Sequence, residues 1–248
     1  AERSDMNRYY YDLHIHSCLS PCGDNDSTPN NIAGMGELNG LNIMALTDHN
    51  TCKNCPAFFK AASRHGIIPV AGMELTTAED IHLVCLFETL EDAMDFDRFV
   101  YSKRILIKNR ADIFGDQLIL NGDDELIGTD DMLLTNATML ALEDAAEAVL
   151  EYGGICYPAH IDREANGIIS VLGGFPDKPK FRLAELHNPE KSENCSSITS
   201  LKRDNYIISS DAHYLWDIKE KREYFELDDE PYSSAKVRRS LFDFLRSL

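Results

Sequence analysis

The sequence predicts an α/β protein whose strands form a closed or nearly closed barrel. Seven short apolar segments have the length and composition of buried strands. Helical segments alternate with them, which is typical of βα units. The length of 248 residues suits one such barrel. We therefore expect residues 1–248 to form a single barrel domain.

The predicted elements follow one another along the chain. The strands are the segments 9–15, 41–46, 66–73, 81–87, 153–158, 182–186 and 205–210. The helices are Asn30–Asn39, Asn54–His65, Leu90–Ile107, Asn136–Tyr152 and Ser233–Ser247. Only seven residues separate Glu74 from His82, too few for a helical crossover. The next strand should therefore return antiparallel and bring His82 beside Glu74.

The pattern of strands and helices breaks in the middle of the chain. The segment DQLILNGDDELIG, residues 116–128, is typical of a β-hairpin that turns at Asn121 and Gly122. We expect this hairpin to belong to an insertion on the barrel at about residues 103–136. Its acidic pairs are typical of solvated turns.

Charge and hydropathy restrict the partners that we expect. The formal net charge is −18, from 24 basic and 42 acidic residues, which opposes attraction to a polyanion such as duplex DNA. No apolar run approaches the roughly 20 residues of a membrane span. The first residues lack the apolar core of a secretory signal, so the expected compartment is the cytoplasm. The sequence makes no prediction of the oligomeric state.

Polar residues recur at the carboxyl ends of the predicted strands, where barrel enzymes build their sites. Asp12, His14 and His16 are spaced two residues apart on the first strand, so we expect their side chains on the same face. Asp12 should then orient one of the imidazole rings. The other strand-end residues are Asp48, His49, Glu74, His160, Asp211 and His213. A lone histidine at such a position is usually structural, but the recurrence predicts a metal centre.

These residues lie in motifs that resemble the PHP superfamily, the polymerase and histidinol phosphatase domains. The motifs are DLHIH, SPCGDNDSTP, ALTDHN, GMEL, IHLV, YPAHID and SSDAH. The resemblance implies a distorted (β/α)7 barrel that holds two to three divalent metals. It implies His14, His16, Glu74 and Asp211 around the first metal, Glu74, His82 and His160 around the second, and Asp24, His49 and His213 around the third. Nitrogen and oxygen donors suit Mn²⁺, Zn²⁺ or Fe.

The implied activity is phosphate ester hydrolysis, in which a hydroxide bridging two metals that share Glu74 attacks phosphorus. Glu74 and Asp211 would thus act in catalysis as ligands. Arg163 is a candidate contact for the substrate phosphate. His187 is a candidate proton donor to the leaving group, although a structural hydrogen bond is an equal alternative. The resemblance favours a small nucleotide-like substrate, such as a nucleoside 3′,5′-bisphosphate or short 5′-phosphorylated RNA.

Three other functions remain as alternatives. One is a histidinol-phosphate or other small-molecule phosphatase of the same superfamily. Another is a 3′-5′ exonuclease, which would prefer a basic track that the net charge argues against. The last is a non-catalytic metal-binding module. A basic group, Lys103, Arg104, Lys108 and Arg110, would either line a groove for a second phosphate or form a solvated helix face.

Four cysteines offer a competing metal site. Cys18 and Cys22 lie in the loop that also holds Asp24, and Cys52 and Cys55 form a CxxC motif in a second loop. Together they would bind a structural zinc ion with four thiolates. The CxxC motif is also typical of an ordinary helix N-terminus or a redox pair.

Overall fold

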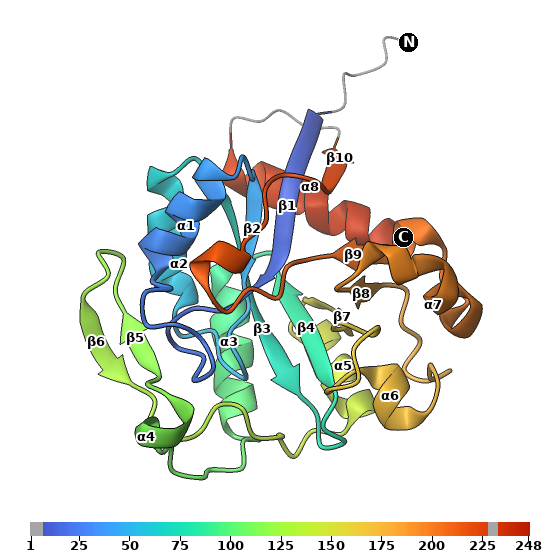
Figure 1. The fold of residues 1–248 in the computed structure, drawn as a ribbon, viewed down its shortest axis with the longest axis horizontal. Coiled ribbons are helices and arrows are strands. Elements are labelled where there is room, and N and C mark those ends of the chain that lie inside the picture. The colour runs from blue at the N-terminus through green and yellow to red at the C-terminus, as the bar shows by residue number, and fades with distance from the viewer. Residues whose placement is uncertain (1–6, 228–232) are drawn as a thin grey trace.

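A six-stranded mixed sheet forms the centre of the computed structural model, which describes residues 7–227 and 233–248 (Figure 1). Its order is β10-β1-β2-β3-β4-β7. The strands are β1 (Asn7–Ile15), β2 (Ile43–Leu46), β3 (Ile68–Thr76), β4 (His82–Phe87), β7 (Ile155–Pro158) and β10 (Tyr224–Leu227). Strands β1, β2 and β3 are parallel, whereas β4 is antiparallel to both β3 and β7. The predicted antiparallel return after Glu74 is confirmed.

Two further strands lie beside the main sheet and continue its curvature. Strands β8 (Ala184–Leu186) and β9 (Tyr206–Ile208) form a separate parallel pair. A bridge between Ile15 and Ala212 joins the chain after β9 to β1, and the Leu13 N–H donates to Ser209 Oγ at 3.1 Å. The fold is therefore α/β with a sheet curled into a half-barrel. All seven predicted strands exist, and the sequence analysis missed β10.

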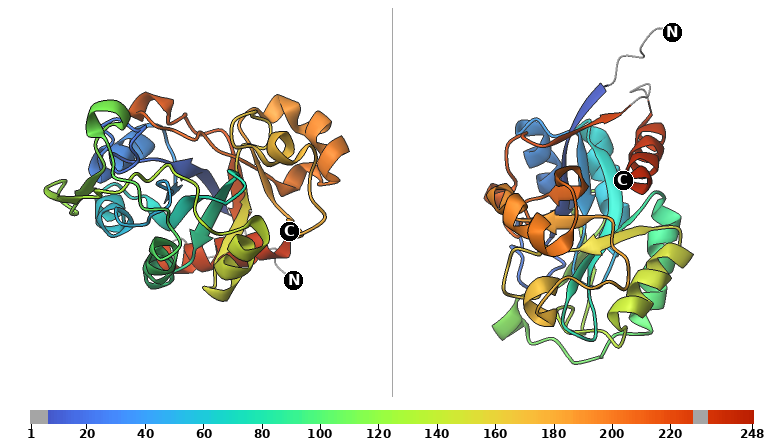
Figure 2. Two further views of the ribbon diagram at one scale, coloured as in Figure 1. Left: turned by 90° about the horizontal axis from the view of Figure 1, so that it is seen from below. Right: turned by 90° about the vertical axis from the view of Figure 1, so that its right-hand side faces the viewer.

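Helices cover the curled sheet. They are α1 (Pro29–Leu38), α2 (Cys55–Arg64), α3 (Leu90–Tyr101), α4 (Ala111–Phe114), α5 (Leu142–Glu151), α6 (Ile168–Leu172), α7 (Ser192–Thr199) and α8 (Ser234–Ser247). Short 3-10 turns are η1 (Pro189–Lys191), η2 (Arg203–Asn205) and η3 (Leu215–Asp217). In the right-hand view of Figure 2, α3, α5 and α8 lie on one side of the sheet and α6 and α7 on the other. Within the described ranges, no helix is both long and apolar enough to cross a bilayer.

Two predicted helices are too long. Helix α3 ends at Tyr101 and α5 begins at Leu142, because the chain between them pairs with itself in extended form. Isolated antiparallel bridges join Arg104 to Thr138 and Lys108 to Met132. Residues 102–107 thus follow tertiary pairing rather than the helical propensity of their side chains.

Two buried apolar clusters lie on the two faces of the strands. Leu13, Ile43, Val70, Val84 and Tyr157 form one cluster together with the buried face of α8. The neighbouring residues of the same strands, such as Met44, Met73 and Phe87, pack with the helices in the other cluster. This alternation, one residue inward and the next outward, makes both faces of the strands apolar.

The predicted hairpin lies at the edge of the molecule, outside the main sheet (Figure 1). Strands β5 (Leu118–Leu120) and β6 (Leu126–Thr129) pair antiparallel. Asp130, after β6, accepts hydrogen bonds from Arg104 at 3.0 Å and from Lys53 at 2.7 Å. Asp130 and Arg104 are both buried, so this ion pair attaches the hairpin to the body of the protein.

Candidate metal centre

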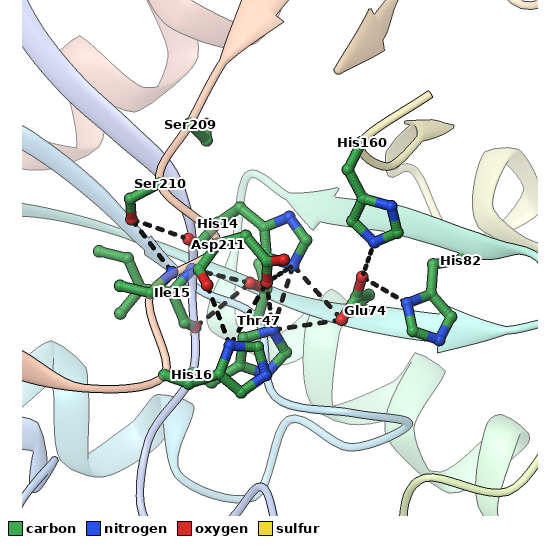
Figure 3. A network of polar contacts seen from close by, with 12 residues as sticks. His14, Ile15, His16, Thr47, Glu74, His82, His160, Ser209, Ser210 and Asp211 are labelled. Atoms are coloured by element: carbon green, nitrogen blue, oxygen red, sulfur yellow. Dashed lines mark hydrogen bonds and ion pairs between the residues drawn. The ribbon is translucent and has the colours of Figure 1, made fainter. Parts of the chain in front are cut away.

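Seven side chains from five other segments converge around Glu74, at the carboxyl end of β3, and Figure 3 labels most of them. We call His14, His16, His49, Glu74, His82, His160, Asp211 and His213 the Glu74 cluster. The cluster contains three groups of possible ligands, and within each group the ligand atoms all lie within 4.8 Å of one another. They are His14, His16, Glu74 and Asp211; His49, Glu74 and His82; and His16, His49 and His213.

The register of β1 places its two histidines in the cluster. The pairing of β1 with β2 shifts between Asp12 and Ile15, so strict alternation of faces does not hold there. Leu13 therefore packs in the α8 cluster and Ile15 in the opposite cluster, while His14 and His16 both face Glu74. Tyr11 and Leu13 both pack in the α8 cluster, so Asp12 and His14 share the other face, but among the described residues no hydrogen bond joins Asp12 to an imidazole ring. Asp12 Oδ1 instead accepts from the backbone N–H groups of Ser210 and His14.

The first group has the dimensions of a four-ligand metal site. Nε2 of His14 lies 3.1 Å from Nε2 of His16, 3.4 Å from Glu74 Oε2 and 3.3 Å from Asp211 Oδ1. Nε2 of His16 is 3.2 Å from each of the same two oxygens. Tetrahedral ligands at about 2.0–2.2 Å from a metal are separated by about 3.3–3.6 Å. The four atoms therefore fit a single ion with little rearrangement.

Glu74 divides its two oxygens between neighbours. Oε2 faces the first group and also His49 Nδ1 at 3.2 Å, whereas Oε1 faces His82 Nδ1 at 2.8 Å and His160 Nε2 at 3.1 Å. In Figure 3, Glu74 lies between His14 on one side and His82 and His160 on the other. A carboxylate in this position can bind two cations at once.

Several buried atoms of the cluster make no well-aligned hydrogen bond among the described residues, although most of them lie close to an oppositely charged atom. They are His49 Nδ1, Glu74 Oε2, His82 Nδ1, His160 Nδ1 and Asp211 Oδ1. A buried polar atom left unpaired costs about 1–3 kcal/mol. His160 and Asp211 also have positive φ angles of 29° and 52°, which are strained for residues other than glycine. Strained backbone angles and buried ring nitrogens and carboxylate oxygens without well-aligned hydrogen bonds are features of a metal site.

The charges of the cluster compensate one another. Burial alone would raise the pKa of Glu74, but the charges of His82, His14 and His49 hold it well below its ordinary value. Burial opposes protonation of His16, yet hydrogen bonds to Asp211 and Glu74 raise its pKa to about 9. Burial, together with the charge of His16, lowers the pKa of His213 to about 4. The carboxylates therefore require nearby cations, which protonated histidines or metal ions can supply.

Two polar contacts that the sequence analysis missed orient the histidines. Both oxygens of Glu185 lie 2.9 Å from His14 Nδ1, opposite the Nε2 that faces Glu74. His16 Nδ1 contacts Ser20 Oγ at 2.9 Å, and Ser20 donates to Asp48 at 2.8 Å. Hydrogen bonds of this kind fix the ring of a metal-binding histidine. A carboxylate at Glu185, between the apolar residues Ala184 and Leu186 of a predicted strand, was the available signal.

Asp24 lies next to the cluster but outside the three groups. Its backbone N–H donates to the His213 carbonyl at 3.0 Å, which brings its loop to the third group. Its Oδ1 accepts from the Asp26 N–H at 2.9 Å. The structure thus brings the Asp24 backbone beside His213, while its carboxylate caps its own turn.

Arg163 and His187 contact each other beside Asp211 of the cluster. Arg163 donates through Nη1 to Asp211 Oδ2 and through Nη2 to His187 Nδ1 at 3.0 Å. Its side chain is 38% exposed, so the guanidinium is accessible from solvent. Burial and the charges of Arg163 and Lys219 lower the pKa of His187, which keeps its imidazole neutral near pH 7.

The four basic residues Lys103, Arg104, Lys108 and Arg110 lie beyond the end of α3, so they form no helix face, and Lys103, Arg104 and Arg110 do not line a common groove. Arg104 is buried and binds Asp130 and the Met132 carbonyl, and Arg110 pairs with Asp112. Lys103 Nζ lies 5.6 Å from the centre of the Phe99 ring. These side chains point to different partners because the helix predicted to carry them ends at Tyr101.

The cysteines are free thiols, and Cys18, Cys52 and Cys55 face backbone carbonyls. Cys52 and Cys55 donate to the Gly72 carbonyl at 3.2 and 3.6 Å, while Cys18 contacts the Leu118 carbonyl at 3.8 Å. Burial raises the pKa of Cys18 to about 12, so it is protonated at neutral pH. None of the ligand groups found in the described residues includes a cysteine. The geometry therefore does not support a four-thiolate zinc site.

Comparison with known proteins identifies the family. The model of the PHP domain matches residues 12–156, more than half of the chain. The chain belongs to the PHP domain family. The match includes six predicted ligands, His14, His16, Asp24, His49, Glu74 and His82, and ends before the other three, His160, Asp211 and His213.

Two characterised relatives match parts of this PHP chain. An error-prone DNA polymerase of Symbiobacterium thermophilum is 35% identical over 99 residues, 40% of this chain and 9% of the polymerase. A 5′-3′ exoribonuclease of Haemophilus influenzae is 32% identical over 112 residues, 44% of this chain and 39% of that enzyme. The PHP chain thus matches less than half of the length of either relative.

Solved structures share the fold. The lesion-specific endonuclease Q of Pyrococcus furiosus has a TM-score of 0.60 and 19% identity, over 94% of this chain and 55% of the endonuclease. A protein from Bifidobacterium adolescentis, named as a metal-dependent phosphoesterase, has a TM-score of 0.59 and 16% identity, over 96% of this chain and 97% of its own. PHP membership and these names support a metal-dependent phosphoesterase.

The expectation that duplex DNA is excluded as a partner is wrong. An endonuclease Q structure with a TM-score of 0.62 and 19% identity, covering 96% of this chain and 57% of its own, holds a 27-mer duplex with an abasic lesion at its active site. A PHP-like fold therefore accommodates duplex DNA. Net charge was a poor criterion because binding depends on the local potential of the contacting face and on bound cations.

Proposed function

We propose that this chain is a metal-dependent phosphoesterase that hydrolyses phosphate esters of nucleotides or polynucleotides, DNA included. The observation that carries the proposal is the convergence of three overlapping ligand groups in one cluster, two of which include Glu74, with buried nitrogen and oxygen atoms that lack well-aligned hydrogen bonds. Two carboxylates and six histidines without thiolates are a donor set that suits Mn²⁺, Zn²⁺ or Fe. The relatives named for polymerase and exoribonuclease activities favour a nucleic-acid type of substrate.

The proposed centre has two to three metal positions. His14, His16, Glu74 and Asp211 would hold the first ion, and Glu74, His82 and His160 the second, with His49 beside it. His49, His213 and the Asp24 loop would hold the third. When bound, such ions would lower the pKa of water and neutralise charge on the phosphate. Three parts of the sequence analysis stay predictions. They are the (β/α)7 strand count, the single domain of residues 1–248 and the insertion at about residues 103–136.

The protein's own residues would orient the ligands and the substrate. Glu185 holds His14, and Ser20 with Asp48 holds His16, so that each Nε2 faces the carboxylates. Arg163 would contact the substrate phosphate through its partly exposed guanidinium. His187, neutral and in contact with Arg163, fits a positioning role better than that of a proton donor.

A hydrolysis screen of metal-loaded protein tests the proposal. The substrates are a nucleoside 3′,5′-bisphosphate, short 5′-phosphorylated RNA, single-stranded DNA, duplex DNA with an abasic site, and histidinol phosphate. We expect turnover of at least one nucleotide-type ester, and its loss in Glu74→Gln but not in Glu79→Gln, an exposed glutamate outside the cluster. Turnover of histidinol phosphate alone would favour the small-molecule phosphatase. No turnover with all metals bound would overturn the proposal.

A further inference from the structure

Two exposed aromatic side chains follow directly after the proposed ligands Asp211 and His213. Tyr214 is 40% exposed and Trp216 is 73% exposed. Their rings stack, with centroids 4.8 Å apart and planes inclined by 16°. Tyr214 therefore covers one face of the Trp216 indole, and the exposed remainder is available to a partner. Aromatic rings of this size are normally buried to a large extent, so such a pair on the surface is a candidate binding platform.

The backbone beneath the platform is firmly held. The Asp217 N–H donates to the Tyr214 carbonyl at 3.0 Å, which closes the η3 turn. Asn39, after α1, donates through Nδ2 to the Ile218 carbonyl at 2.7 Å and accepts from the Lys221 N–H at 2.9 Å. Ile218 is buried. A ring pair on such a support loses little conformational entropy when it binds a ligand.

The platform lies close to the Glu74 cluster. Three residues of chain span at most about 11 Å, so the Trp216 Cα cannot lie farther than this from the Cα of His213. His213 belongs to the third ligand group. A ligand whose phosphate reached the cluster could therefore extend its remaining part over the two rings.

We propose that Tyr214 and Trp216 stack an unpaired nucleobase of the substrate whose phosphate reaches the Glu74 cluster. The inference rests on the proposed function and adds the recognition of the base. Every base presents a π face to an aromatic ring, and stacking requires no positive charge on the protein. Stacking therefore supplies affinity that does not depend on the net charge of the chain, which is −18. A single-stranded end or a displaced base presents the required free face.

Trp216 is the only tryptophan of the chain, so its fluorescence reports on the platform directly. Metal-loaded protein is mixed with adenosine 3′,5′-bisphosphate and, in parallel, with ribose 5-phosphate, which carries a phosphate without a base, and the emission is read by stopped flow before turnover. We expect saturable quenching by the adenine nucleotide and none by the sugar phosphate. Equal quenching by both compounds, or by neither, would overturn the inference. So would a change of emission on diluting the protein alone, which would indicate a second copy as the occupant.

Variants separate base recognition from hydrolysis. Trp216→Ala should raise the KM for a base-containing ester about tenfold with little change in kcat. Trp216→Phe should restore most of the affinity, and Leu150→Ala, an exposed apolar side chain on α5, should have no effect. The KM for a substrate without a base should not change in any variant.

The outcomes distinguish this inference from the proposed function. Hydrolysis of nucleotide esters with the same KM in wild type and Trp216→Ala would refute the platform and leave the phosphoesterase intact. Base-dependent quenching without hydrolysis of any ester would support the platform and refute the phosphoesterase. An equal rise of KM for substrates with and without a base would show a structural effect of the substitution and overturn the inference.

Discussion

Replacing Glu185 by glutamine tests whether this buried carboxylate holds His14 in the orientation that a metal needs. Glu185 is 1% exposed, and its Oε1 accepts from His14 Nδ1 at 2.9 Å and from the His160 N–H at 3.0 Å. The second oxygen also lies 2.9 Å from His14 Nδ1. Glutamine keeps the shape of the side chain but replaces one oxygen by a donor. It therefore removes the charge that stabilises the His14 N–H.

The expected magnitude follows from these contacts. The remaining amide oxygen can still accept from His14 Nδ1 and from the His160 N–H, but the amide NH₂ takes the place of Oε2, where it faces His14 Nδ1–H as a second donor without an acceptor. An unpaired buried donor costs about 1–3 kcal/mol of folding free energy. Loss of a hydrogen bond behind a metal-binding histidine lowers metal affinity by about 10–100-fold. We expect both effects in Glu185→Gln.

The assay is a competition titration of Mn²⁺ or Zn²⁺ against a chelator, with urea unfolding of the metal-free protein measured alongside. Glu37→Gln is the matched control, because Glu37 lies on α1 with a side chain 58% exposed. Wild-type metal affinity in Glu185→Gln would refute the role that we assign to Glu185. Reduced stability with unchanged metal affinity would show that Glu185 has only a structural role.

Three further predictions concern the periphery of the site. Asp130→Asn should lower the free energy of unfolding by about 3 kcal/mol, because Arg104 is left buried without its carboxylate. Burial opposes the charged form, but the paired cations hold the pKa of Asp130 below its usual value. This stabilisation is complete above about pH 4 and is lost as the pH falls through the folded-state pKa. Asp24→Ala should remove one metal and most activity, and Cys52→Ser should leave the metal content unchanged.

Each of these predictions has a result that would contradict it. The first fails if urea unfolding of Asp130→Asn and of wild type gives equal free energies at pH 7. Full metal content in Asp24→Ala, with a loss in Asp26→Ala, would move the ligand role to Asp26. A lower zinc stoichiometry in Cys52→Ser would restore the thiolate site that the geometry does not support.

Strand positions and most ligand candidates were readable from the sequence because local patterns carry them. Apolar segments bounded by turns predicted seven strands, and each exists. The short connection after Glu74 correctly predicted an antiparallel return, since chain length alone forbids a crossover. Helix ends were less accurate, because residues 102–107 pair with a segment about 30 positions later, which no local pattern reveals.

The sequence by itself determined which residue types gather at the strand ends, and hence the metal chemistry. Only the tertiary structure decided how these side chains are arranged around Glu74. The register shift in β1 allowed both His14 and His16 to face Glu74, and β8 brought Glu185 to His14 from 171 positions along the chain. Strand register and long-range contacts depend on packing of the whole sheet. A local sequence pattern contains no information about such packing.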